Sequence, residues 1–278
     1  MPIVTGMPII EARDVFFGYD DGPAILKGVS AAIGEGEFIG LIGQNGSGKT
    51  TLAKNFNGLL KPTSGVVRVN GRDTKTHSIP VIARTVGFVF QNPDHQIFCS
   101  TVREELAFGP VNMGKSPETT RELVQDAMER FKIEKYADFP PAILGFGLRR
   151  KVSLAAVYAM RPRVMILDEP VTGLDWKSAM ELMEALANLN RFGHTIILIT
   201  HDMRVIAEFT RRCIVLREGG IAADGPTREV LADFDMLEKN RLRPPEIVQL
   251  SDKLIGRGLK EHVFSAGEFL EKYRREAG

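Results

Sequence analysis

The sequence has little cysteine, no long apolar run and almost no net charge. Its 278 residues include two cysteines, Cys99 and Cys213, without CxxC spacing. This argues against a disulfide framework or a thiolate zinc site and fits a reducing compartment. No run of about 18 apolar residues occurs, so we expect no membrane span in this chain. A net charge of +1 gives no general attraction to nucleic acid, and we predict no nucleic-acid partner.

The order of strand-like and helix-like segments predicts an α/β fold with a mostly parallel sheet. Short alternating runs near the start indicate antiparallel strands with a hairpin at Asp20–Pro23. Helical spacing fills about residues 100–160, and strand and helix patterns alternate after it. We therefore predict one domain over residues 1–235, with a helical subdomain inserted at about 95–160, and a C-terminal extension over 236–278.

The clearest functional motif is GQNGSGKT, which follows a short apolar run and matches G-x-x-x-x-G-K-[ST]. Its glycines let backbone N–H groups turn toward phosphate oxygens. Lys49 is expected to reach the β- and γ-phosphates, and the Thr50 hydroxyl to hold Mg²⁺. A glycine-rich loop without a ligand is the alternative, but the motif has the strand before it and the helix after it that phosphate binding requires. The predicted nucleotide-binding residues are Tyr19, Gly43, Gln44, Asn45, Gly46, Ser47, Gly48, Lys49, Thr50 and Thr51.

Polar residues follow three other apolar runs, where the carboxyl ends of parallel strands place ligands. Asp168 and Glu169 end VMILDE, so we predict that Asp168 binds Mg²⁺ and that Glu169 is the general base for the attacking water. His201 follows TIILIT and is predicted to donate to the γ-phosphate. Gln91 follows TVGFVF and is predicted to reach Mg²⁺ or the water. The alternatives are turn-capping acids, a structural histidine and an exposed loop amide.

Tyr19 lies in a short loop upstream, where its ring could stack on adenine; packing in the core is the alternative.

Taken in order, these motifs resemble those of the ATP-binding-cassette ATPases over roughly residues 8–235. Within that family, FQNPDHQIFCSTVREELAFGPVNMG is similar to the energy-coupling-factor group, the ATPases of cobalt, nickel and vitamin importers. The resemblance implies a P-loop NTPase with a RecA-like core, an antiparallel β subdomain and an inserted helical subdomain. It also implies ATP and Mg²⁺ as cofactors and hydrolysis coupled to uptake.

The same resemblance implies three partners. Two ATPase subunits, identical or different, dimerise head to tail, and each ATP lies between one subunit's phosphate loop and the other's signature. A transmembrane coupling subunit inserts a helix into a groove lined by the stretch after Gln91, and a substrate-binding membrane subunit chooses the solute. The chain is then peripheral, at the cytoplasmic face of the cell membrane. Two other classes stay open: a soluble cassette ATPase not tied to transport, and a regulatory nucleotide-binding subunit with weak hydrolysis.

The signature departs from the family pattern Leu-Ser-Gly-Gly-Gln, because this chain has LGFGL. Leu144 and Gly147 keep the frame, while Gly145 replaces the serine, Phe146 the first glycine and Leu148 the glutamine. The missing hydroxyl removes a donor to the partner's γ-phosphate, and we expect a helix that starts after Gly147 to keep its partial positive charge. A weakened contact is therefore predicted; a tolerated variant with full activity is the alternative. The residues that match the family's D-loop, which links the two sites, are Gly173, Leu174 and Asp175.

Overall fold

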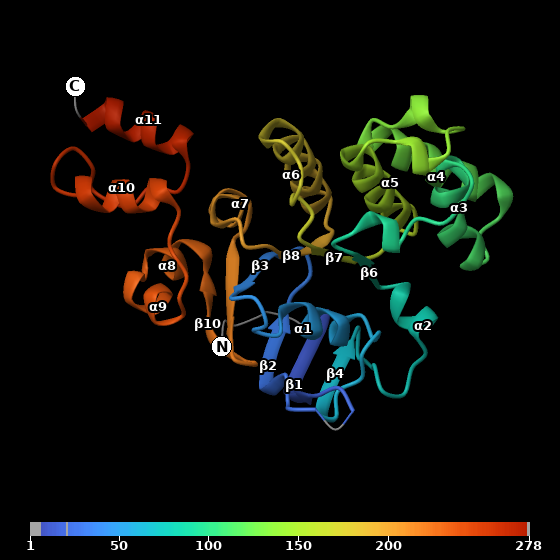
Figure 1. The fold of residues 1–278 in the computed structure, drawn as a ribbon, viewed down its shortest axis with the longest axis horizontal. Coiled ribbons are helices and arrows are strands. Elements are labelled where there is room, and N and C mark those ends of the chain that lie inside the picture. The colour runs from blue at the N-terminus through green and yellow to red at the C-terminus, as the bar shows by residue number, and fades with distance from the viewer. Residues whose placement is uncertain (1–6, 21, 277–278) are drawn as a thin grey trace.

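A six-stranded sheet forms the centre of the computed structural model, which describes residues 7–20 and 22–276 (Figure 1). All its neighbouring strands are parallel except the pair at one edge, which is antiparallel. The central strands are buried throughout, which explains their continuous apolar runs. The predicted mostly parallel α/β sheet is therefore confirmed. The strand order is β10 (Gly220–Pro226), β9 (Arg212–Arg217), β3 (Phe38–Gly43), β8 (Thr195–Ile199), β7 (Val164–Asp168) and β6 (Val86–Val89).

A second, antiparallel sheet of four strands covers one face of the central sheet, and an apolar core joins the two. Helix α1 (Lys49–Phe56) buries Leu52 and Phe56 in that core. The predicted pairing of the first two strands is confirmed, although Asp21 in the turn of the expected hairpin lies outside the described residues. The strand order is β2 (Leu26–Ile33), β1 (Ile10–Phe17), β4 (Ser64–Val69) and β5 (Arg72–Asp73).

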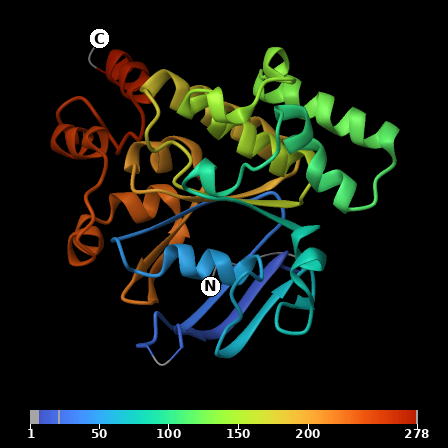
Figure 2. The ribbon, with the colours of Figure 1, turned by 45° about the vertical axis from the view of Figure 1, so that its right-hand side comes forward.

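Helices cover the other face of the central sheet around a second apolar core. Three of them, α3 to α5, form an arm that projects to one side (Figure 2). Within the described part of the chain, no helix is both long and apolar enough to cross a membrane. After α1, the next six helices along the chain are α2 (Ile79–Ala83), α3 (Val102–Asn112), α4 (Pro117–Phe131), α5 (Phe146–Ala159), α6 (Trp176–Arg191) and α7 (Met203–Phe209).

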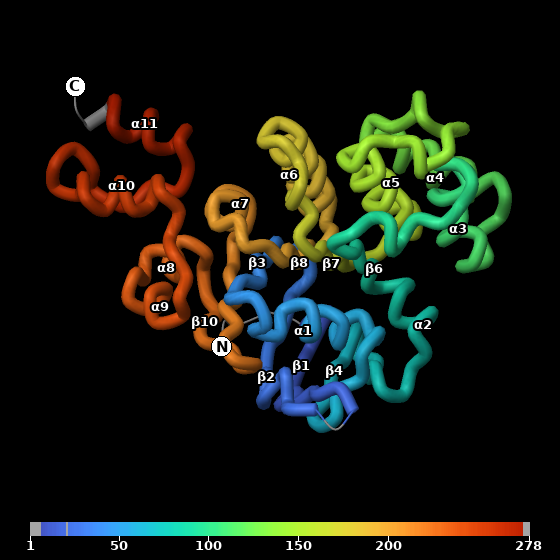
Figure 3. Tube along the Cα trace, in the orientation of Figure 1, coloured from blue at the N-terminus to red at the C-terminus, as the bar shows by residue number. Residues whose placement is uncertain are grey.

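The C-terminal helices lie on the side of the core opposite the arm of α3 to α5 (Figure 3). Val248 and Phe264 join the large core, so this region packs on its own chain. Glu268 accepts hydrogen bonds from Arg228 and Lys272. Burial raises the pKa of the Glu268 carboxyl, but these bonds outweigh burial and lower it to about 2. The helices are α8 (Thr227–Ala232), α9 (Phe234–Lys239), α10 (Glu246–Leu254) and α11 (Ala266–Glu276).

Candidate functional site

Four neighbouring parallel strands end at one edge of the central sheet and bring the predicted site residues together. Strand β3 ends at Gly43 and β7 ends at Asp168. Strand β8 is followed by His201 and β6 by Gln91. Asp168 pairs in register with Ile199, the last residue of β8, so the acids and the histidine follow adjacent strand ends. The order of strands therefore creates the site, as the rule for parallel sheets requires.

The phosphate loop curves around the side chain of Lys49. Its Nζ donates to the carbonyl oxygens of Gly43 at 2.8 Å and Gln44 at 2.9 Å. Gly43 cannot carry a side chain, because its φ is +149° and a Cβ would lie 2.3 Å from the Leu216 carbonyl oxygen. The loop is also braced from the β9–β10 turn, where the Gly219 N–H donates to the Ser47 carbonyl at 3.1 Å.

The charge of the Lys49 ammonium is only partly stabilised by its protein surroundings. Burial lowers the pKa of Lys49, and the nearby carboxylates of Glu169 and Asp168 only partly oppose that effect. Bound phosphate oxygens add negative charge at this point and stabilise the ammonium. The tip residues Gln44, Asn45 and Gly46 are exposed, and a Cβ built on Gly46 meets no atom within 4 Å. Ser47, Gly48 and Lys49 are buried beneath them, and Thr51 is half-buried on the first turn of α1.

Thr50 and Asp168 bring together two oxygen donors of the kind that Mg²⁺ prefers. The Thr50 hydroxyl donates to Asp168 Oδ2 at 2.9 Å across the gap between α1 and β7. Burial raises the pKa of Asp168, while the Thr50 hydrogen bond and the cations of Lys54 and Lys49 lower it in part. Among residues 7–20 and 22–276, no group of three or more His, Cys, Asp or Glu could hold a metal alone. The donors therefore fit Mg²⁺, which takes one or two protein ligands and completes its shell with phosphate oxygens and water.

Glu169 is held by three hydrogen bonds. Its Oε2 accepts from the hydroxyls of Thr172 at 3.0 Å and Thr200 at 3.1 Å, and its Oε1 contacts His201 Nδ1 at 2.9 Å. The residue has φ +49°, in the left-handed region that residues other than glycine uncommonly adopt. Three of about four lone-pair sites are thus used, and one is left to accept from a water. The two threonines were not predicted, because a hydroxyl after a strand has no distinguishing pattern.

The geometry of His201 refines its predicted role. The ring is exposed, and Nδ1 must donate to the Glu169 carboxylate, which only accepts. Nε2 then carries a proton only in the imidazolium. Donation to a γ-phosphate therefore requires a charged ring or a rearranged Glu169 contact.

Gln91 and Tyr19 occupy more open positions. The Gln91 side chain is exposed, two residues beyond β6, and its carbonyl accepts from Arg150. The structure therefore fixes the backbone of Gln91 and leaves its amide free to reach into the site. The Tyr19 ring meets Phe17 edge to face at 4.9 Å and keeps half of its surface exposed. Tyr19 thus packs on Phe17 and keeps part of its ring exposed, and its stacking on adenine stays a prediction.

The signature helix begins earlier than predicted. Helix α5 starts at Phe146, with Gly145 as its N-cap, so the expectation of a start after Gly147 is wrong. Gly145 has the extended backbone of an N-cap residue, which lets the next residue enter the helix. Phe146 turns its ring onto Gly173, where a Cβ would lie 3.1 Å from the ring. The backbone of Gly147 faces the Leu174 side chain of the same D-loop.

The remaining signature and D-loop residues have structural partners. Leu144 is buried in the large core, and Leu148 is half-buried against it. Asp175 caps α6, where its carboxylate accepts from the N–H of Ser178 at 3.0 Å and from its hydroxyl at 2.7 Å. These hydrogen bonds lower the pKa of Asp175.

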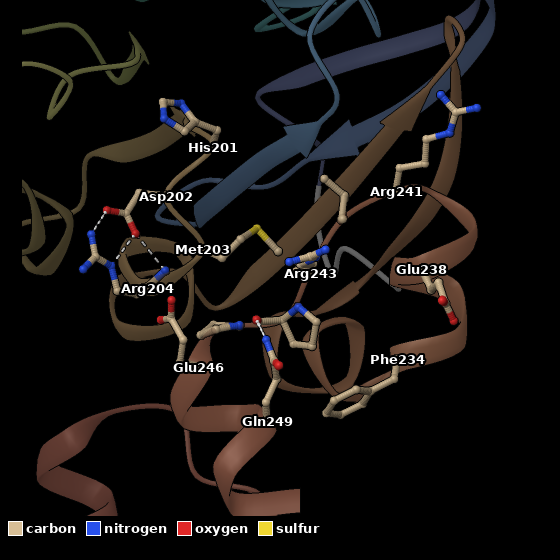
Figure 4. Close-up of a pocket in the computed structure, with 13 residues that line it drawn as sticks. His201, Asp202, Met203, Arg204, Phe234, Glu238, Arg241, Arg243, Glu246 and Gln249 are labelled. Carbon is tan, nitrogen blue, oxygen red and sulfur yellow. Dashed lines mark hydrogen bonds and ion pairs between the residues drawn. The ribbon is translucent and has the colours of Figure 1, made fainter.

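A cavity of about 1070 Å³ adjoins the site without being part of the phosphate loop. Its walls come from the segment after β8, with His201 and Arg204, and from the C-terminal region, with Arg241, Arg243 and Gln249 (Figure 4). His201 is the one predicted catalytic residue in this wall. The tip of the phosphate loop lines a separate, smaller cavity of about 130 Å³, together with Glu218 and Arg241.

Comparison with known proteins identifies the family. The ABC transporter family model matches residues 26–172. The chain belongs to the ABC transporter family. An EcfA, an energy-coupling factor transporter ATP-binding protein of Methanocaldococcus jannaschii, is 40% identical over 250 residues, which are 89% of this chain and 90% of that protein. A longer relative from Caldanaerobacter subterraneus is 47% identical over 249 residues, and the match spans 44% of its length.

Solved structures of this family confirm the fold class. The cbiO1 structure from Clostridium perfringens has a TM-score of 0.76 and 36% identity, and the match covers 89% of this chain and all of that one. A dimeric cassette, MJ0796, described in a post-hydrolysis state with ADP and Pi, has a TM-score of 0.72 and 28% identity, with 79% and 99% covered. The fold is therefore that of a P-loop NTPase with a RecA-like core, an antiparallel β subdomain and a helical subdomain. The cassette is an ATPase that uses ATP with Mg²⁺.

Replacing the predicted base tests its role. Glu169→Gln keeps the shape and the two threonine contacts but removes the basic lone pair. We expect hydrolysis to fall by about 10² to 10⁴-fold, the range for a general base, while ATP binding is retained. Steady-state hydrolysis and binding of ATP measure the two quantities. Glu122→Gln, at an exposed position on α4, is the control; a Glu169→Gln enzyme as active as that control contradicts the role.

Restoring the signature serine tests the predicted defect. A side chain at Gly145 meets no atom within 4 Å, and φ is −61°, so Gly145→Ser fits the fold. A hydrogen bond to a charged phosphate is worth about 1.5–3 kcal/mol, which is roughly ten- to 150-fold in binding of a slowly hydrolysed ATP analogue by the ATPase dimer. The serine also caps α5, and the melting temperature without nucleotide measures that separate effect. Unchanged affinity and turnover would mean that LGFGL already works as a signature.

Proposed function

We propose that this protein is the ATP-hydrolysing subunit of an energy-coupling-factor-type importer, peripheral to the cytoplasmic face of the cell membrane. It couples ATP binding and hydrolysis to uptake of a metal ion, cobalt or nickel, or of a vitamin. The EcfA relatives support this proposal, as does the cbiO1 structure, which is described as part of the ABC transporter complex cbiONQ. In this chain, an apolar groove beside the Gln91 loop carries the proposal.

The groove is a cavity of about 310 Å³ lined by the helical arm and by α2. Phe98 and Phe108 line it with 64% and 48% of their surface exposed, and their rings meet edge to face at 4.7 Å. Met113 and Met160 also line it. Two large exposed aromatic rings in an apolar concavity mark a partner site, and methionines adapt to an inserted helix. The groove therefore fits an apolar helix of a transmembrane coupling subunit.

The groove is connected to the nucleotide site through the chain that lines it. The Gln96 amide oxygen accepts from the Phe90 N–H at 3.2 Å, next to Gln91. Glu105 on α3 accepts from the N–H groups of Phe98 at 3.0 Å and Cys99 at 2.9 Å. A helix seated in the groove thus touches a segment whose other end lies beside the site. This link favours a permease partner over a soluble cassette ATPase.

The proposed catalytic steps use the groups already placed at the sheet edge. Lys49 and the loop N–H groups bind the phosphates, and Thr50, Asp168 and Gln91 would hold Mg²⁺, which when bound neutralises phosphate charge. Glu169 accepts a hydrogen bond from the attacking water and orients it. The three contacts that hold Glu169 favour an active hydrolase over a regulatory subunit with weak hydrolysis.

We further propose the division of the chain and its remaining partners. Residues 1–235 are the cassette, with the helical subdomain at about 95–160, and residues 236–278 are a C-terminal extension. A second ATPase subunit, identical or different, supplies its signature to this phosphate loop, and LGFGL faces the nucleotide of that subunit. Four half-exposed apolar residues of the extension support a contact there: Leu250, Ile255, Leu270 and Tyr273. A substrate-binding membrane subunit then selects the solute.

Removing the groove aromatics tests the proposal. Phe98→Ser with Phe108→Ser should abolish co-purification with membrane subunits, because buried aromatic anchors each contribute about 2 kcal/mol or more, roughly 30-fold. Basal ATP hydrolysis of the isolated chain should stay within about twofold. Phe192→Ser removes an aromatic ring with 74% exposure away from the groove and is the control. Intact membrane complexes with the double variant would contradict the proposed partner site.

A further inference from the structure

Arg150 is a fully buried cation whose guanidinium holds the Gln91 loop. Its Nη1 donates to the Phe90 carbonyl at 2.8 Å, and its Nη2 donates to the Gln91 carbonyl. No ion pair in the described part of the chain includes Arg150, and its Nε has no hydrogen-bond partner there. Taking a charge out of water is costly, and the two carbonyl acceptors offset part of that cost.

The ring of Phe146 contacts Arg150 one turn along α5. The Arg150 Cζ lies 5.3 Å from the ring centroid, a cation–π distance. The same ring covers Gly173 of the D-loop, whose φ of +82° suits glycine and whose missing Cβ leaves room for the aromatic edge. Phe146 therefore links the guanidinium that grips the Gln91 loop to the backbone of the D-loop.

A second arginine of α5, Arg149, contacts the segment that follows Gln91. Arg149 Nε lies 2.9 Å from Asp94 Oδ1, and Asp94 is three residues after Gln91. The first turn of α5 thus holds the segment after β6 at two points, one ionic and one through backbone carbonyls. Since both arginines leave from one helical turn, a shift of this segment displaces the start of α5.

We propose that Arg150 and Phe146 form a tie that joins the Gln91 loop, the signature helix and the D-loop of one subunit into a single moving unit. Arg150 is a positioning residue that acts through the Gln91 backbone, and Phe146 acts through Gly173. The phenylalanine in LGFGL then has a mechanical role within its own chain. This inference rests on the Mg²⁺ role proposed above for Gln91, and the test separates the two.

A single tryptophan reports on the D-loop end of the tie. Trp176 is the only tryptophan in the sequence and lies three residues after Gly173, at the start of α6. Its ring is 49% exposed, and the Arg204 Cζ lies 4.7 Å from its centroid. A displacement of the D-loop changes this environment, so Trp176 emission follows the D-loop in the unmodified protein.

The experiment is a Mg²⁺ titration of the full chain with a saturating, slowly hydrolysed ATP analogue, read by Trp176 emission. Wild type should show a Mg²⁺-dependent change. Arg150→Lys keeps the charge but loses the planar fork, and Phe146→Leu keeps apolar volume but loses the π face. Each should reduce the amplitude at least about threefold, and in Arg150→Lys the analogue affinity without Mg²⁺ should stay within about twofold. The double variant should be no worse than either single one, as expected for one coupled unit.

Arg161→Lys is the matched control, because Arg161 stacks on Tyr158 at 4.4 Å in the same subdomain and belongs to neither the Gln91 loop nor the D-loop. It should respond like wild type. A wild-type response in Arg150→Lys or Phe146→Leu, a lost response in Arg161→Lys, or no Mg²⁺-dependent change in wild type would each overturn the tie. Gln91→Ala separates the premises: a retained response there contradicts the Mg²⁺ role of Gln91. A response lost in Gln91→Ala but kept in Arg150→Lys contradicts the tie alone.

Discussion

The hydrogen bond from the Thr50 hydroxyl to the Asp168 carboxylate joins the two halves of this site. Thr50 belongs to the helix that follows β3, and Asp168 ends β7, with β8 between the two strands. Their contact requires the parallel register of the sheet and the sharp turn of the phosphate loop at Gly43. This contact places Lys49 and Glu169 on the two sides of one site.

The same edge is compatible with the proposed dimer of two ATPase subunits. The tip of the phosphate loop is exposed, while Asp168 is buried beneath it. The start of α5 lies on a separate helical arm, packed against its own D-loop. In the proposed dimer, the second subunit supplies donors on the free side of the nucleotide. The contacts of Arg150 and Phe146 give that arm a fixed relation to the Gln91 loop. Binding at the loop and movement of the arm are thereby connected.

Much of this site could be predicted from the sequence, because its residues follow recognisable apolar strands. The phosphate loop, Asp168 and Glu169 each sit at a strand end that local pattern identifies, and the sheet order then places them together. The partners of Glu169, Thr172 and Thr200, could not be predicted, since they depend on how two loops fold. Contacts between residues about sixty positions apart, such as Arg150 with Gln91, leave no local periodicity. The sequence also did not predict that α5 starts at Phe146, whose ring packs on Gly173, a glycine distant in the sequence.

The most direct measurement of the central claim is the Mg²⁺ dependence of ATP affinity in Asp168→Asn. The substitution keeps an oxygen that can accept from Thr50 but removes the charge that binds the metal. Calorimetric titration with and without Mg²⁺ should show that the ion tightens ATP binding to wild type. The Mg²⁺-dependent gain in ATP affinity should be at least about tenfold smaller in the variant, because a charged metal ligand is lost. ATP affinity without Mg²⁺ should be equal or higher in the variant, because a negative charge near the phosphates is gone. The same Mg²⁺ enhancement in both proteins would contradict the account of this site.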